Sequence, residues 1–116
     1  MAKDVTIYHN PNCTKSRRTL ELLRGRGIEP KIIEYLKTPP SPDELRHLLG
    51  LLGLTPRQFV RAKDAAEVGL DVDTLTDDEL IAGMSANPKT IERPIVVAGD
   101  KAAIGRPPET VLAILV

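Results

Sequence analysis

The chain has 116 residues, 41% of them hydrophobic, and its 16 basic and 16 acidic side chains give a formal net charge of zero. This length and hydrophobic content favour a single domain spanning residues 1–116, and the balanced charge provides no overall attraction to nucleic acid or to an anionic membrane. No segment approaches the roughly 20 apolar residues of a membrane span, and no apolar signal segment opens the chain, so we expect a cytoplasmic protein.

The first third of the sequence predicts a strand, a helix and a second strand. Residues 4–9, DVTIYH, form a β-branched and aromatic run that ends in a turn at Asn-Pro-Asn. Residues 14–26 place leucines on one helical face, and glycines mark the end of this helix. Residues 31–36, KIIEYL, give the next strand, which we expect to run parallel to the first.

Three helices are predicted in the middle of the chain, because three segments carry the signature of a helix start. The segments SPDE (41–44), TPRQ (55–58) and TDDE (76–79) each pair a capping hydroxyl with Glu or Gln three residues later. The first two also have proline at the first helical position. The expected helices lie near residues 42–52, 56–62 and 77–86.

The sequence returns to strands near the C-terminus. The segments PIVVA (94–98) and KAAI (101–104) flank the turn residues Gly99-Asp100 and predict a hairpin. Pro107 and Pro108 precede a last predicted helix at 109–116. The complete pattern is β-α-β, a helical insertion at about 41–88, and β-β-α. It predicts an α/β fold of the thioredoxin/glutaredoxin-like kind, with a mixed sheet and packed helices.

Cys13, the only cysteine, stands at the expected start of the first helix, in the segment HNPNCTKSRR. At this N-cap position the amides of Lys15 and Ser16 have no intrahelical acceptor and point toward the sulfur. The helix dipole and Arg17 add positive charge. We therefore expect the pKa of the thiol to lie below its ordinary value of about 8.5, which makes Cys13 a nucleophile. The alternative is a buried structural thiol, which would not need basic neighbours.

A single cysteine also limits the chemistry. It excludes an internal disulfide and a cysteine-based metal cluster, and we expect no metal at the site. Ser16 occupies the second position of a Cys-x-x-Cys pair. An oxidised or thiolated Cys13 must therefore be regenerated by a thiol from outside the chain.

Among the arginines after the first helix, three stand in isolated positions that suggest a site: Arg61, Arg93 and Arg106. Each one alone is more often a solvated surface residue. A guanidinium group keeps its charge and binds oxyanions through two parallel hydrogen bonds. If these three converge on the thiolate, they form an oxyanion pocket.

Taken together, these segments resemble the glutaredoxin-coupled arsenate reductases, a thioredoxin-fold family with one catalytic cysteine. The resemblance covers essentially the whole chain and is carried by YHNPNCTKSR, EYLKTPPSPDEL, ERPIVV and GRPPETVLAIL. It implies that Cys13 forms a covalent adduct with arsenate, and that the peptide bond before Pro94 is cis. The arginines expected to bind the oxyanion are Arg61, Arg93 and Arg106. The residues expected to support the thiolate are His9, Asn10, Ser16 and Arg17.

The same resemblance implies a reaction sequence and its partners. Glutathione serves as co-substrate, glutaredoxin completes the reduction to arsenite, and no metal or organic cofactor is bound. Two other functions share the scaffold. One is an Spx-type regulator that binds RNA polymerase, and the other is a glutathione-dependent thiol reductase without arsenate specificity. Arsenate-dependent turnover with glutathione and glutaredoxin would separate the arsenate reductase from the regulator. Loss of turnover in Arg93→Ala with an intact fold would separate oxyanion chemistry from generic thiol exchange.

Overall fold

A computed structural model describes residues 4–115 of the chain. The chain divides into two compact units, one formed by residues 1–38 and 93–116 and the other by residues 39–92. The helical insertion predicted at about 41–88 falls within the second unit. The description of residues 1–116 as one domain stays a prediction.

The first unit contains a four-stranded sheet in the order β2-β1-β3-β4. β1 runs parallel to β2 and antiparallel to β3, which pairs in turn with β4 as an antiparallel hairpin. The predicted mixed α/β fold is therefore confirmed. The strands are β1 (Val5–Tyr8), β2 (Lys31–Ile33), β3 (Ile95–Ala98) and β4 (Lys101–Ile104).

β2 ends three residues before the predicted end of its strand. The carbonyl oxygen of Glu34 accepts hydrogen bonds from the amides of Lys37 and Thr38, both at 2.9 Å. These bonds close a turn, so the chain leaves the sheet after Ile33 although Tyr35 and Leu36 continue the apolar pattern.

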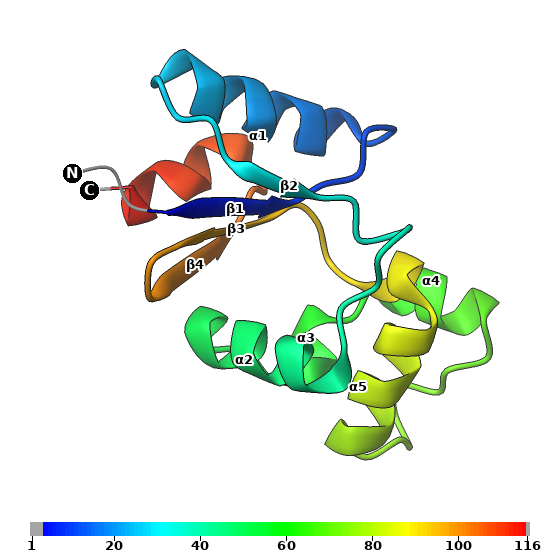
Figure 1. The fold of residues 1–116 in the computed structure, drawn as a ribbon. Helices are drawn as coiled ribbons and strands as arrows, with labels where there is room; N and C mark the ends of the chain where they lie inside the picture. Colours follow the sequence, from blue (N-terminus) through cyan, green and yellow to red (C-terminus); the bar gives the residue numbers. More distant parts are fainter. Residues whose placement is uncertain (1–3, 116) are drawn as a thin grey trace. The chain divides into compact units, whose positions relative to one another are not determined.

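Two helices of the first unit, α1 (Thr14–Gly25) and the 3₁₀ helix η2 (Pro108–Ile114), lie on the same side of the sheet (Figure 1). η2 occupies most of the last predicted helix, of which Val116 lies outside the described residues. Alternate strand residues face these helices, as expected from the period of two. The shared core consists of Val5, Ile7, Leu20, Leu23, Val96, Ala98, Ala103, Val111 and Ile114.

The second unit is helical, and α5 packs against α2, α3 and the short 3₁₀ helix η1. All three predicted starts are confirmed. The Ser41 hydroxyl accepts from the Glu44 amide, while Thr55 and Thr76 each form a complete capping box. The elements are α2 (Pro42–Leu52), α3 (Pro56–Phe59), α4 (Ala62–Glu67), α5 (Asp77–Ala86) and η1 (Pro88–Thr90).

The helix predicted at 56–62 is wrong in its second half. α3 stops at Phe59, because Val60 adopts an extended backbone and forms a β-bridge with Ile91. The amide of Arg61 also leaves the helix and donates to the carbonyl oxygen of Thr90 at 2.7 Å. A separate helix, α4, begins after Arg61 and was not predicted. In the described part of the chain, no helix combines the length and apolar character needed to cross a membrane.

Candidate active site

Cys13 stands at the end of a tight loop that connects β1 to α1. The Cys13 amide donates to the Asn10 carbonyl oxygen at 3.0 Å, and the Asn12 amide donates to the Asn10 side-chain oxygen at 3.0 Å. Arg17 donates from Nη1 to the carbonyl oxygen of Pro11 at 2.8 Å. Arg17 therefore holds the loop backbone from the first turn of α1.

The structure puts Cys13 at the N-cap of α1, as predicted. Its backbone is extended, and its carbonyl oxygen accepts the first helical hydrogen bond, from the Arg17 amide at 3.0 Å. The thiol is half-buried, and its sulfur makes no side-chain capping hydrogen bond of good geometry to the first turn of α1. Burial raises its pKa, but the Ser16 amide, the Arg93 guanidinium and the Lys15 amide together lower that pKa below its ordinary value. These dipoles and this charge favour a thiolate.

Arg93 supplies the full positive charge at the sulfur, through both a hydrogen bond and its Coulombic attraction. Arg106 lies next to it, because Arg106 Nε donates to the carbonyl oxygen of Arg93 at 2.8 Å. The structure therefore brings Arg93 to Cys13 and Arg106 to Arg93. The Arg93–Pro94 peptide bond is cis, which confirms that prediction, and the Arg106–Pro107 bond is also cis.

Gly105 allows the chain before Arg106 to pass close to Pro94 and to Thr19 of α1. Its amide donates to the carbonyl oxygen of Pro94 at 2.9 Å. A Cβ atom at this position would lie 2.5 Å from Thr19 Oγ1 and 2.9 Å from Pro94 Cγ. Since Thr19 is fully buried in α1, only glycine fits here without displacing its neighbours.

His9, Asn10 and Ser16 form a small buried network behind the loop. A hydrogen bond of 2.6 Å joins His9 Nδ1 to Ser16 Oγ, and the Asn10 amide donates to the same oxygen at 3.0 Å. Ser16 is fully buried and His9 is 7% exposed. Burial lowers the pKa of His9; Glu34 acts against this effect, and Arg24 and Arg17 reinforce it. The network thus holds a neutral imidazole against the first turn of α1.

Arg61 belongs to the second unit, where its guanidinium binds two carboxylates. Nε donates to Asp64 Oδ2 at 2.7 Å, and Nη1 donates to Glu92 Oε1 at 3.0 Å. These two contacts connect α4 to the segment after η1. The role of Arg61 at an oxyanion stays a prediction.

Tyr35 is a site residue that the sequence analysis missed. It is 1% exposed, and within residues 4–115 its hydroxyl oxygen has no hydrogen-bond partner of good geometry. Burial raises the pKa of this hydroxyl. The charge of Arg93 lowers this pKa, the charge of Cys13 raises it, and the Asn10 side chain lowers it. The hydroxyl therefore lies close to all three groups. The available signal was its place just after a strand parallel to β1, because the carboxyl ends of such strands meet at one edge of the sheet.

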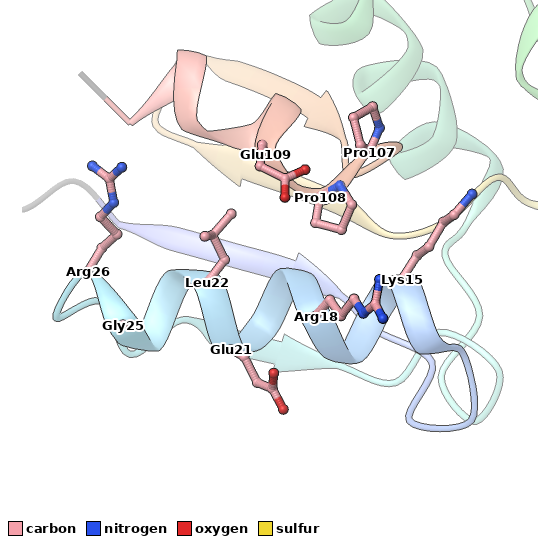
Figure 2. Close-up of a pocket in the computed structure, with 9 residues that line it drawn as sticks. All are labelled: Lys15, Arg18, Glu21, Leu22, Gly25, Arg26, Pro107, Pro108 and Glu109. Carbon is pink, nitrogen blue, oxygen red and sulfur yellow. The ribbon is translucent and has the colours of Figure 1, made fainter.

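A groove of about 670 Å³ runs along α1 beside the first residues of η2. Figure 2 shows Lys15 and Arg18 on the first turns of α1, Arg26 at its far end, and Leu22 and Glu109 pointing toward one another. One end of the groove is adjacent to the site, since Lys15 follows Cys13 by two residues and Pro107 follows Arg106. The lining residues are Lys15, Arg18, Glu21, Leu22, Gly25, Arg26, Pro107, Pro108 and Glu109.

Within the described residues 4–115, no three His, Cys, Asp or Glu side chains lie close enough together to hold a metal ion. The prediction that the site uses no metal remains a prediction.

Comparison with known proteins identifies relatives over nearly the whole chain. An uncharacterised protein of Escherichia coli K12, YfgD, is 50% identical over 118 residues, which cover 99% of each chain. An arsenate reductase of Haemophilus influenzae is 50% identical over 114 residues, covering 96% of this chain and 98% of the relative. The solved structure of an arsenate reductase from Vibrio cholerae superimposes with a TM-score of 0.93 at 50% identity, covering 99% of this chain and all of the other.

The family model of the ArsC family matches residues 8–114. This match spans the Cys13 loop, both arginines beside it and the helical insertion. It confirms the family resemblance seen in the sequence. The chain belongs to the ArsC family.

Proposed function

We propose that the protein reduces arsenate to arsenite through a covalent adduct on Cys13. The observation that carries this proposal is the position of the thiol, which has a lowered pKa and lies between the first amides of α1 and the Arg93 guanidinium. Such a thiolate attacks an electrophilic centre, and the adjacent cation favours an anionic substrate. The arsenate reductases among the relatives support arsenate as that substrate.

Arg93 and Arg106 are the proposed oxyanion-binding groups in the first unit. The Arg106 side chain is held against the Arg93 main chain, because Arg106 Nε donates to the Arg93 carbonyl oxygen. Guanidinium groups keep their charge and bind tetrahedral oxyanions through paired hydrogen bonds. We propose Arg61 as a third group, although its guanidinium already carries Asp64 and Glu92.

The proposed chemistry begins with attack of the Cys13 thiolate on arsenic, so that a sulfur–arsenic bond forms and one oxygen leaves as water. Glutathione then displaces a second oxygen as water, which gives arsenic(V) two sulfur ligands. A glutaredoxin thiolate attacks the glutathione sulfur, and the electron pair of the broken sulfur–arsenic bond stays on arsenic, which becomes arsenic(III). The two outside thiols leave as a mixed disulfide, and water releases arsenite from Cys13.

Two features support glutathione as the second thiol. Cys13 is the only cysteine of the chain, so no second thiol within the chain could resolve an adduct on it. The groove of Figure 2 is adjacent to the site and presents Lys15 and Arg18 at that end, with Glu109 opposite. These charges complement the two carboxylates and the ammonium group of glutathione. The cytoplasm supplies glutathione and glutaredoxin together, and we propose that location.

The direct test is arsenite formation from arsenate with glutathione and glutaredoxin present. We expect turnover that requires all three reagents and that disappears in Cys13→Ser. Arg46→Ala, which removes surface ion pairs with Asp43 and Asp78, is the control and should keep wild-type turnover. If glutathione and glutaredoxin support disulfide reduction but no arsenite forms, the thiol reductase without arsenate specificity replaces this proposal.

A further inference from the structure

The hydroxyl of Tyr35 is buried without a hydrogen bond of good geometry among the described residues. Tyr35 is 1% exposed, and among residues 4–115 no group offers its hydroxyl oxygen a hydrogen bond of good geometry. A polar group that is buried without a partner costs stability, and buried tyrosine hydroxyls usually have one. An unmet donor inside a protein therefore calls for an explanation, and a role in binding or catalysis is one.

The backbone brings this hydroxyl to the Cys13 loop. Tyr8, the last residue of β1, is in register with Ile33, the last residue of β2. The His9 amide extends this pairing by donating to the Ile33 carbonyl oxygen at 2.8 Å. Tyr35 follows Ile33 by two residues, and the turn that begins at Glu34 directs the chain out of the sheet. The first residues of the Cys13 loop and Tyr35 thus leave the same edge of the sheet side by side.

The groups around the hydroxyl are those of the candidate active site. The Asn10 and Arg93 side chains lie near enough to donate toward its oxygen, though not with good geometry, and the charges of Arg93 and Cys13 act on it. Burial, the largest effect, raises the pKa of Tyr35 above its ordinary value of about 10. The hydroxyl consequently keeps its proton at neutral pH and is a hydrogen-bond donor.

We propose that Tyr35 is a further oxyanion-binding residue, whose hydroxyl donates a hydrogen bond to an oxygen of the substrate anion held by Arg93 and Arg106. This inference rests on the proposed function, because it assigns the missing partner of the hydroxyl to the substrate. The hydroxyl adds a neutral side-chain donor to the two cationic side chains, Arg93 and Arg106, that are proposed to bind the anion. It also fixes one oxygen relative to the sulfur, since the same hydroxyl lies close to Cys13.

The melting temperature of Tyr35→Phe distinguishes a role in substrate binding from a purely structural role. If the hydroxyl only served folding, its removal would lower the melting temperature. If it binds the substrate, Tyr35→Phe removes an unsatisfied buried donor from the substrate-free protein, so the melting temperature should stay the same or rise. The phenyl ring keeps its packing in this variant.

The experiment compares wild type, Tyr35→Phe and Tyr8→Phe, which removes the only other tyrosine hydroxyl and is the matched control. The probes are sodium arsenate and sodium sulfate, and the readout is the concentration of each anion that half-protects Cys13 from iodoacetamide. We expect this concentration to rise about 10-fold or more in Tyr35→Phe, as for loss of a hydrogen bond to a charged group. The same factor should appear in the arsenate KM, while Tyr8→Phe matches wild type.

Three outcomes would overturn the inference. Half-protection within twofold of wild type in Tyr35→Phe, with wild type itself protected, would remove Tyr35 and leave the proposed function intact. Weaker protection together with a lower melting temperature would assign the hydroxyl to folding. Absence of protection in wild type would remove both the proposed function and this inference.

Discussion

Arg106 Nε donates to the main-chain carbonyl oxygen of Arg93 at 2.8 Å. This bond joins the second residue after β4 to the second residue before β3, and the two are neighbours because the hairpin returns the chain. Arg93 in turn acts on the Cys13 thiol. One side-chain to main-chain hydrogen bond therefore holds Arg106 beside the residue that supplies positive charge to the sulfur.

Arg106→Lys should separate charge from position. Lysine keeps the positive charge but lacks the fixed Nε donor and the planar fork of arginine, so it cannot hold the Arg93 carbonyl and an oxyanion in the same geometry. We expect kcat/KM for arsenate to fall about 10-fold or more. The control is Arg24→Lys, at a half-exposed ion pair with Glu29, which should retain the wild-type value. Equal kcat/KM in both variants would show that charge alone is sufficient at residue 106.

Ser16→Ala should destabilise the fold more than its size suggests. The fully buried Ser16 Oγ is the partner of both His9 Nδ1 and the Asn10 amide. Removing it leaves two polar groups unsatisfied, which costs about 2–4 kcal/mol in the free energy of unfolding. Ser41→Ala, which removes an exposed capping hydroxyl from α2, should cost about 1 kcal/mol. Urea unfolding measures both, and similar losses in the two variants would contradict the buried network.

His9 should make stability depend on pH. Burial lowers its folded pKa, so between the unfolded value of about 6.5 and the lower folded value the unfolded chain binds a proton that the native chain does not. The free energy of unfolding consequently falls as the pH drops below about 6.5. We expect a smaller fall in His9→Gln between pH 7 and pH 5, measured by urea unfolding at each pH. Ser41→Ala, which removes no titratable group, should keep the wild-type dependence, and an unchanged dependence in His9→Gln would contradict this account.

The elements that the sequence predicted well carry local signals. Ser41, Thr55 and Thr76 predict helix starts, because their side chains accept hydrogen bonds from amides within the first turn. The Gly99-Asp100 turn predicts the hairpin. α4 carries no such signal, because its N-cap is Arg61 and no side chain caps it. Its start is fixed by contacts with the segment at Thr90 to Glu92, which lies about 30 residues away in sequence.

Arg61→Ala tests whether Arg61 only stabilises the fold through its ion pairs or also binds the oxyanion. Asp64 and Glu92 are each about a quarter exposed, 22% and 26% respectively, and they lose their cation in the variant. After allowance for solvent screening, the free energy of unfolding should fall by about 1–2 kcal/mol. If Arg61 also binds the oxyanion, as proposed, the arsenate KM should rise in the folded variant.

Asp64→Asn provides the matched control for Arg61. It weakens the same ion pair but leaves the guanidinium in place, so it should lower stability without raising the arsenate KM. A rise in KM of the same size in both variants would assign the effect to the structure of α4 and not to contact between Arg61 and the substrate.

The candidate site was predictable only where its parts are local. The position of Cys13 before α1 follows from the Pro-containing loop and the helix start, and the amides of Lys15 and Ser16 follow from that position. Arg17 was expected to act on the sulfur, yet it holds the Pro11 carbonyl, and Arg93 provides the charge instead. Tyr35 was missed because KIIEYL continues an apolar strand pattern past Ile33, whereas the turn at Glu34 removes Tyr35 from the sheet.

The most direct test of the account is the pH dependence of Cys13 alkylation by iodoacetamide, in wild type and in Arg93→Ala, with and without arsenate. The account predicts a wild-type midpoint below the ordinary thiol value of about 8.5, a higher midpoint in Arg93→Ala, and slower alkylation when arsenate is present. A wild-type midpoint equal to that of the urea-unfolded chain, unchanged by arsenate and by the loss of Arg93, would contradict it.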